Sequence, residues 1–230
     1  MSTFASRLAA IQARIRAAEA AAGRSPGEVR LVAVGKTFPA DAVREAVAAG
    51  VTDIGENYIQ EARDKFEALQ GTRAAWHFIG HLQTNKARYA VRMFDLIHTV
   101  DSYRLTLELD RCARKIHKIQ AVLVQVNVAG ETSKSGVAPA EALPLIRQAA
   151  TLENLAVKGL MTVPPYFNAP EKVRPFFAAL RRLRAEIAAA GIANLALQEL
   201  SMGMTGDFEA AVAEGATLVR IGTALFGERA

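Results

Sequence analysis

The sequence predicts an α/β fold, a single (β/α)8 barrel of the TIM type with an extra helix at its N-terminus. Strand-like apolar runs alternate with helix-like segments from one end of the chain to the other, which is typical of a parallel sheet. Eight such units fit within the 230 residues, and no long linker or shift in composition separates them. We therefore expect one domain over residues 1–230. A doubly wound open sheet is the alternative arrangement of the same alternation.

The first element is predicted to be an amphipathic helix within residues 1–25. Four apolar side chains recur there at helical spacing, namely Phe4, Leu8, Ile11 and Ile15. The arginines between them would also fit a transit peptide. Glu19 and the lack of a signal-type apolar core favour the helix instead.

The first half of the chain then alternates short apolar strands with helices. Residues 30–35 are rich in Val and Leu and end in glycine, as a buried parallel strand would. Residues 86–91 are interpreted as part of a helix that Thr84 or Asn85 caps. The same alternation predicts strands at 51–55, 76–80 and 96–100, and helices at 40–49, 58–69 and 105–116.

The second half repeats the pattern. Residues 121–128 are the clearest strand, because the run is continuous and β-branched, as a fully covered strand should be. A helix over 171–190 has Gly191 as its stop signal. The remaining predictions are strands at 156–162, 195–200 and 217–221, and helices at 138–151 and 208–213.

Composition excludes several classes of protein. Half of the residues (51%) are hydrophobic, yet no apolar stretch approaches the ~20 residues of a membrane span. The single cysteine, Cys112, excludes an intramolecular disulfide and fits a reducing cytosol, so we expect a cytoplasmic protein without a membrane partner. The net charge is +5, but Lys and Arg are spread along the chain. The densest run, residues 111–118, has the spacing of one solvated helix face, so nucleic acid is not an expected partner.

Lys36 is the most informative residue. It follows the predicted strand at 30–35 directly, so its amine would project into whatever pocket the sheet opens. A poorly solvated lysine has a lowered pKa, which makes the neutral, nucleophilic amine accessible near neutral pH. Such lysines form Schiff bases with carbonyl ligands. The alternative is a lysine whose amine extends to solvent at a strand end.

Two glycine-rich loops stand where a barrel commonly binds phosphate, after the seventh and eighth strands. The first is Ser201-Met202-Gly203-Met204-Thr205-Gly206, and the second is Arg220-Ile221-Gly222-Thr223. Glycines let backbone N–H groups approach an anion, and Ser201 and Thr223 add hydroxyl donors. The same glycines could serve merely to turn the chain. Together, the two loops favour a phosphate site.

Arg220 is a second charged residue at the end of an apolar strand. Beside a heteroaromatic ligand it would keep a ring nitrogen unprotonated, because adjacent positive charges repel. The alternative is a structural salt bridge, with Glu199 as the candidate partner.

The residues at the other strand ends indicate a function less specifically. Asn57 can orient a ligand or cap the helix that it precedes, and His81 is interpreted as pocket lining rather than an acid/base group. Met161 could either pack in the core or contact a ligand. The histidines are not spaced as metal ligands and there is no second cysteine, so no metal site is expected.

Several stretches together resemble the YggS/PROSC family of pyridoxal phosphate homeostasis proteins, whose fold is like the N-terminal barrel domain of alanine racemase. The matching stretches, spread over residues 30–227, are Val34-Gly35-Lys36-Thr37, Gly55-Glu56-Asn57-Tyr58, Trp76-His77-Phe78-Ile79-Gly80 with His81-Leu82-Gln83, Lys134-Ser135-Gly136, Gly159-Leu160-Met161-Thr162, Leu200-Ser201-Met202-Gly203-Met204-Thr205 with Asp207, and Val219-Arg220-Ile221-Gly222-Thr223.

The resemblance implies a role for each of these positions. Lys36 would carry pyridoxal 5′-phosphate (PLP) as a Schiff base, and Arg220 would face the pyridine nitrogen. Ser201, Gly222 and Thr223 would hold the phosphate, together with Met202 and Gly203 of the first loop. Asn57, His81 and Met161 would line the pocket.

The favoured function is therefore a PLP-binding protein of intracellular PLP homeostasis that buffers or delivers the cofactor without strong catalysis of its own. Its partners would be PLP and apo-PLP enzymes as recipients, and we expect a monomer. A small PLP-dependent amino-acid racemase is the alternative. Racemases of related fold use a tyrosine from an additional β-domain, which we expect this chain to lack. A basic RNA-binding or scaffolding protein has little support.

Overall fold

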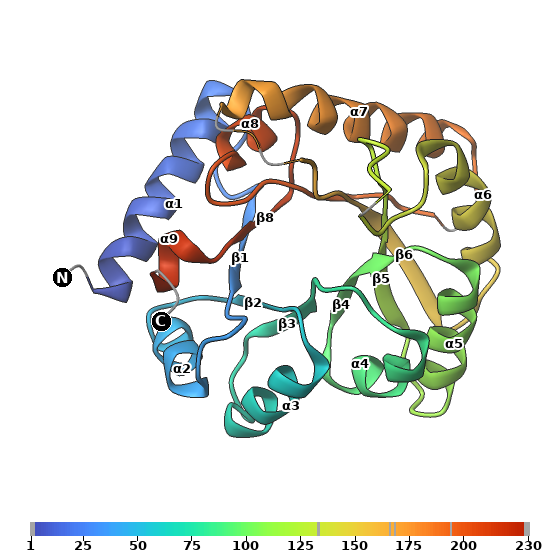
Figure 1. Ribbon diagram of the computed structural model, residues 1–230, viewed down its shortest axis with the longest axis horizontal. Helices are drawn as coiled ribbons and strands as arrows, with labels where there is room; N and C mark the ends of the chain where they lie inside the picture. Colours follow the sequence, from blue (N-terminus) through green and yellow to red (C-terminus); the bar gives the residue numbers. More distant parts are fainter. Residues whose placement is uncertain (1–2, 133, 166, 168, 194, 228–230) are drawn as a thin grey trace.

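The computed structural model describes residues 3–132, 134–165, 167, 169–193 and 195–227. Its centre is a closed barrel in which eight parallel strands follow one another in chain order, with β8 pairing back to β1 (Figure 1). The strands are β1 (Arg30–Val34), β2 (Asp53–Glu56), β3 (Ala75–Phe78), β4 (Leu96–Val100), β5 (Gln120–Gln125), β6 (Leu155–Met161), β7 (Glu199–Ser201) and β8 (Leu218–Ile221). The predicted (β/α)8 barrel is confirmed, and the open sheet is wrong.

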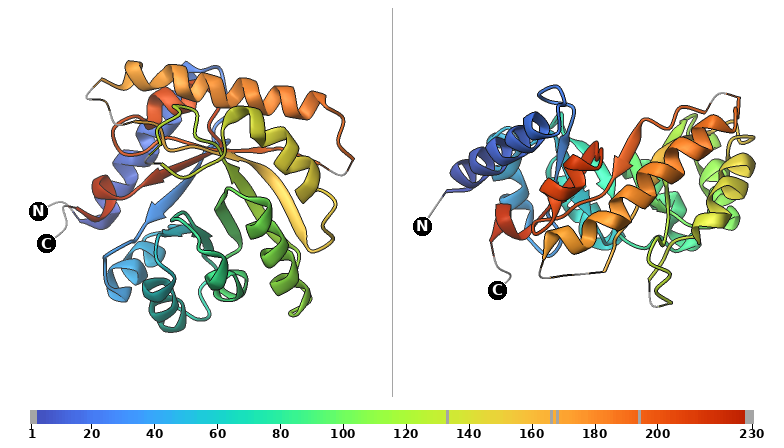
Figure 2. Two further views of the ribbon diagram at one scale, coloured as in Figure 1. Left: turned by 45° about the vertical axis from the view of Figure 1, so that its right-hand side comes forward. Right: turned by 90° about the horizontal axis from the view of Figure 1, so that it is seen from above.

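Helices surround the strands on the outside, as crossover connections between parallel strands require (Figures 1 and 2). They are α1 (Phe4–Ala21), α2 (Ala40–Ala48), α3 (Ile59–Ala68), α4 (Ala87–Met93), α5 (Tyr103–Arg114), α6 (Pro139–Ala149), α7 (Pro170–Ala189), α8 (Phe208–Ala213) and α9 (Thr223–Phe226). The leading helix packs against α8 and α9. Its four periodic apolar side chains are buried, as the spacing predicts.

The core has two parts. Most buried apolar side chains lie in one large cluster that includes those of the surrounding helices. A smaller cluster is formed by strand residues, namely Val32, Leu96, Leu123, Met161 and Leu218. Polar side chains on the barrel strands, among them His77 on β3 and His98 on β4, are also buried.

Element boundaries differ from the predictions in a few places. The strand predicted at 195–200 is β7, three residues long, because Leu195 and Leu197 pack on the core from an irregular segment. The strand predicted at 121–128 ends at Gln125, where β6 ends and the backbone of Asn127 bonds to Val137 instead.

Two helix ends were also predicted wrongly. Thr84 and Asn85 do not cap α4, since they lie in a 3-10 turn (Thr84–Lys86) that leads into it without a side-chain cap. The basic run does not share one helix face, because α5 ends at Arg114 and Lys118 lies beyond it. The Lys118 amine is turned inward and donates to the carbonyls of Val91 and Phe94.

Candidate functional site

A pocket of about 470 Å³ lies at the carboxyl ends of the strands. The carboxyl ends of all eight strands meet at this end of a barrel, and the loops that follow them build the site. The described residues that line the pocket are Val34, Lys36, Phe38, Asn57, Ile79, Val163, Phe167, Met204, Thr205, Gly206, Asp207, Arg220, Gly222, Thr223 and Gly227. The lysine and the arginine identified in the sequence therefore share one cavity with the second glycine-rich loop.

The turn that carries Lys36 has a strained backbone. Thr37 adopts a φ of 68°, which is unusual for a β-branched residue. Its backbone N–H donates to Glu61 Oε2 of α3 at 2.8 Å. Strain of this kind persists only where the surrounding contacts impose it, so α3 helps to fix the direction in which Lys36 leaves the strand.

A buried ion pair supports the same turn from behind. Lys65 Nζ donates to the carbonyl oxygen of Gly35 and to Glu56 Oε1, both at 2.7 Å. Burial raises the pKa of Glu56 to about 7, although the hydrogen bond from Lys65 opposes the rise. A side chain at residue 35 would meet Glu56 Oε1 at 3.0 Å, which explains the glycine before Lys36.

Asn57 does not cap α3. The residue before that helix is Tyr58, and no side chain caps its first turn. The Asn57 Oδ1 atom is buried and has no hydrogen-bond partner among the residues that the structure describes. A buried acceptor without a partner is costly unless something else donates to it. Because Asn57 lines the pocket, its amide oxygen is available to a ligand.

Arg220 is held by two hydrogen bonds at the base of the pocket. Its Nη1 donates to Ser201 Oγ at 2.5 Å, and its Nη2 donates to the carbonyl oxygen of Thr162 at 2.8 Å. Burial lowers the pKa of Arg220 to about 10, partly offset by the charge of Asp207. Glu199 pairs with Arg30 at 2.8 Å, so the salt bridge between Glu199 and Arg220 is wrong.

The fold and the site geometry agree with what the chain is similar to. Residues 6–230 match the family model described as alanine racemase, N-terminal domain. The chain is 48% identical to the pyridoxal phosphate homeostasis protein of Pseudomonas aeruginosa, over 100% of this chain and 97% of that protein. This chain belongs to the family of pyridoxal phosphate homeostasis proteins. The family member from Aquifex aeolicus is 46% identical, with 97% of each chain covered.

Solved structures extend the comparison. PipY of Synechococcus elongatus, solved with PLP bound, has a TM-score of 0.86 and 38% identity, covering 98% of this chain and all of that chain. An alanine racemase from Clostridium difficile has a TM-score of 0.71 at 16% identity and covers 94% of this chain and 55% of that one. The second likeness shows the fold alone. The resemblance to this family, drawn from the sequence motifs, is confirmed.

Five of the ten residues predicted for the site line the pocket, namely Lys36, Asn57, Arg220, Gly222 and Thr223. The first glycine-rich loop contributes different residues from those predicted. Its lining members are Met204, Thr205 and Gly206, whereas Met202 is buried in the large core. Gly203 has a φ of 91° and packs against α8, where a Cβ would lie 2.6 Å from the Cβ of Ala211.

Three other predicted residues point elsewhere. The Ser201 hydroxyl is fully buried between Arg220 and His98, whose Nδ1 lies 2.8 Å away. His81 is exposed and its Nδ1 lies 3.2 Å from Ser135 Oγ. Met161 packs inside the barrel, in agreement with the alternative of a packing methionine. Their roles toward a ligand stay predictions.

Two functional candidates were missed from the sequence. Asp207 lines the pocket, and burial raises the pKa of its carboxyl although a backbone hydrogen bond from Met204 and the charge of Arg220 oppose the rise. The signal was an acidic residue directly after a glycine-rich loop. His98 lies in the middle of β4, whose five residues are all buried. A polar residue inside so apolar a strand indicates a partner in the barrel interior.

Neither a metal site nor a membrane-spanning helix is found in the part of the chain that the structure describes. No group of three or more His, Cys, Asp or Glu side chains is arranged to hold a metal ion. No helix within the described ranges is long and apolar enough to cross a membrane.

Proposed function

We propose that this chain binds PLP covalently through Lys36 and serves intracellular PLP homeostasis. It would act in the cytoplasm as a monomeric, single-domain carrier that buffers the cofactor or delivers it to apo-PLP enzymes. The observation that carries the proposal is that Lys36, Arg220 and an unpartnered acceptor on Asn57 line one pocket. The PLP bound to PipY and the names of the curated relatives support the same ligand.

The chemistry of the lining residues fits each part of PLP. The aldehyde requires an amine, which Lys36 supplies. The phosphate requires donors, and Thr223 offers its hydroxyl beside the backbone of Gly222, at the start of α9. The pyridine nitrogen accepts a hydrogen bond, and Arg220 can only donate. Gly222 lies against β1, since a Cβ there would be 3.5 Å from the carbonyl oxygen of Val34.

When bound, PLP supplies an electrophilic carbon for amines and an electron sink for their adducts. The residues of this chain restrain that chemistry. An arginine beside the ring nitrogen disfavours a proton there, so the ring stays a weaker sink. Lys36 would hold the aldehyde carbon of PLP through its Nζ, with one water released on binding. Addition of one water would release PLP again, as a carrier requires.

Absorption spectroscopy of the purified protein tests the proposal. Loading with PLP should give a visible band that survives gel filtration in the wild type and is lost in Lys36→Ala. Lys158→Ala is the matched control, because Lys158 is an exposed lysine on β6. A wild-type protein that takes up no PLP would overturn the proposal. Delivery is tested by the rate at which loaded protein activates an apo-enzyme, compared with free PLP at equal concentration.

A further inference from the structure

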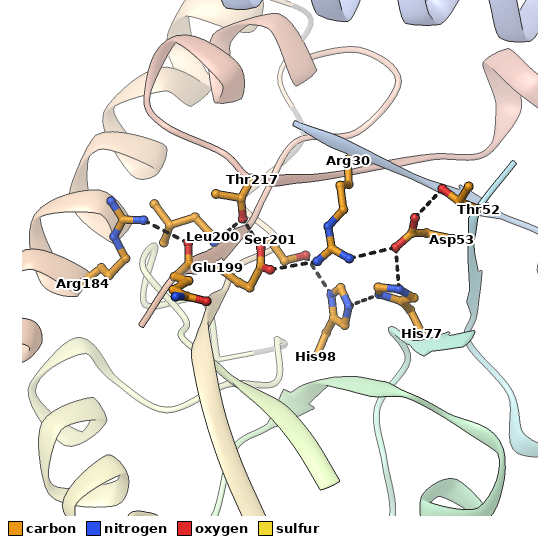
Figure 3. Close-up of polar contacts among 11 residues, drawn as sticks. Arg30, Thr52, Asp53, His77, His98, Arg184, Glu199, Leu200, Ser201 and Thr217 are labelled. Atoms are coloured by element: carbon orange, nitrogen blue, oxygen red, sulfur yellow. Dashed lines mark hydrogen bonds and ion pairs between the residues drawn. The ribbon is translucent and has the colours of Figure 1, made fainter. Parts of the chain in front are cut away.

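A line of hydrogen-bonded polar side chains crosses the barrel interior beneath the pocket. His77 Nε2 lies 3.0 Å from Asp53 Oδ1, and His77 Nδ1 lies 2.9 Å from His98 Nε2. The line continues from His98 Nδ1 to Ser201 Oγ at 2.8 Å, and from there to Arg220 Nη1. Figure 3 shows the part from Asp53 to Ser201. All five residues are at most 5% exposed and come from five different strands.

The two ends of the line determine which atoms donate. Arg220 has no acceptor atom, so Ser201 Oγ accepts from it and can pass its own hydrogen to His98 Nδ1. An ionised Asp53 can only accept, so His77 Nε2 carries a hydrogen. In two neutral imidazoles the remaining bond then runs from His98 Nε2–H to His77 Nδ1. Every donor in the line therefore points from Arg220 toward Asp53.

The charges around the line favour this arrangement. Burial pushes the pKa of Asp53 upward, but hydrogen bonds from His77 and Thr52 outweigh it and leave that pKa below its usual value. Arg30 also pairs with Asp53, at 3.2 Å, from the end of the barrel opposite the pocket. Burial, together with the positive charges of Arg220 and Arg30, lowers the pKa of His98 well below its usual value, so this ring is neutral.

We propose that Asp53, His77 and His98 are positioning residues that act on Arg220 through Ser201, by fixing one direction of hydrogen bonding through the barrel. Bonds in such a chain polarise and strengthen one another. Asp53, on the second strand, thereby holds the guanidinium of the eighth strand in the orientation it presents to the pocket. This inference rests on the proposed function, because the group that Arg220 is oriented toward is the bound PLP ring.

The direction of the chain can be measured without any ligand. The protein has only four histidines, and two of them, His81 and His117, are exposed. In full-length protein labelled with ¹⁵N-histidine, NMR should show both buried rings as neutral Nε2–H tautomers. Two buried rings in the Nδ1–H form would overturn the proposal.

Asp53→Asn is the decisive variant, because it keeps the shape of the side chain but can donate to His77 Nε2. The tautomers of His77 and His98 should then both switch to Nδ1–H, which places a second donor against Ser201 Oγ beside Arg220. His77→Phe is a second variant, which keeps a planar ring but removes both the donor to Asp53 and the acceptor for His98. Lys158→Ala is the control, since Lys158 is exposed on β6 and is not a member of the line.

The effect on the site is measured with PLP as the probe. Weakening a hydrogen bond to a charged group should raise the dissociation constant of PLP about tenfold in Asp53→Asn and shift the pH at which the visible band titrates. His77→Phe should change the dissociation constant and the titration of the band in the same direction, and Lys158→Ala should change neither. Switched tautomers with unchanged affinity and unchanged band would overturn the positioning role. Failure of wild-type protein to take up PLP would instead overturn the proposed function, while the tautomers still decide the direction of the chain.

Discussion

Glu56 and Lys65 form an ion pair at 2.7 Å directly behind the turn that carries Lys36, and both side chains are at most 5% exposed. The second carboxylate oxygen of Glu56 has no hydrogen-bond partner within the described residues. Burial therefore raises the pKa of Glu56 to about 7 despite its partner. A buried pair of this kind contributes little net stability, but it ties α3 to the strand that bears Lys36.

The first prediction concerns the pH dependence of stability. Between its usual pKa of 4.5 and about 7, Glu56 holds a proton in the native protein that the unfolded chain has released. The free energy of unfolding should therefore fall as pH rises through this range. Relative to Glu56→Gln, which stays neutral, the wild type should lose up to about 3 kcal/mol. Urea unfolding of both proteins at several pH values measures the difference.

Glu45→Gln is the control for that measurement, because Glu45 is an exposed glutamate on α2. Its stability should follow that of the wild type at every pH. Parallel curves for the wild type and Glu56→Gln would show that Glu56 is ionised throughout.

Thr223 is predicted to hold the phosphate of PLP. A hydrogen bond to a charged group is worth about 1.5–3 kcal/mol, so Thr223→Ala should weaken PLP retention about tenfold or more. Thr223→Ser keeps the hydroxyl and should restore most of the affinity. Dissociation constants from titration of the visible band measure both variants. If Thr223→Ala retained PLP as tightly as the wild type, the phosphate would have to bind at other residues.

Gly80 allows the loops after β2 and β3 to touch. A Cβ at this position would lie 2.0 Å from the carbonyl oxygen of Asn57, so Gly80→Ala must displace the backbone beside the pocket. We expect a loss of about 1–3 kcal/mol in the free energy of unfolding, together with weaker PLP binding. At Gly206 nothing lies within 4 Å of such a Cβ, so Gly206→Ala is the control for stability. Denaturant unfolding of the two variants should separate them clearly.

Amino-acid turnover is predicted to stay at or near background. Racemisation needs positioned acid/base groups on both faces of the substrate carbon. Lys36 serves one face, but no tyrosine or cysteine is among the described residues that line the pocket. Tyr58 is 56% exposed and lies outside the lining, and Tyr166 falls outside the described residues. Incubation with each L-amino acid followed by chiral chromatography measures turnover. Steady racemisation above that of free PLP, abolished by Lys36→Ala, would establish the racemase instead.

Much of the fold could be predicted because local patterns repeat. The run at 96–100 and the helix at 208–213 were predicted to the residue, since apolar continuity and helical spacing are local properties. The strand at 195–200 was misplaced because Leu195 and Leu197 have the alternation of a strand but pack, partly buried, on the core from an irregular segment. The alternation of apolar and polar residues shows which side chains face the core. It does not show whether the backbone pairs with a neighbouring strand, because that depends on the packing of elements distant in the sequence.

The sequence by itself determined the barrel, the family and the placement of Lys36, Arg220 and Thr223 at strand ends, because these depend on the order of elements along the chain. Only the tertiary structure decided where side chains within one loop point. It turned the Ser201 hydroxyl into the barrel toward His98, and it placed Asp207 in the pocket. The physical reason is that His98 and Ser201 are 103 residues apart. No local pattern encodes a hydrogen bond between β4 and β7, two strands that do not pair and that approach each other only across the interior of the closed barrel.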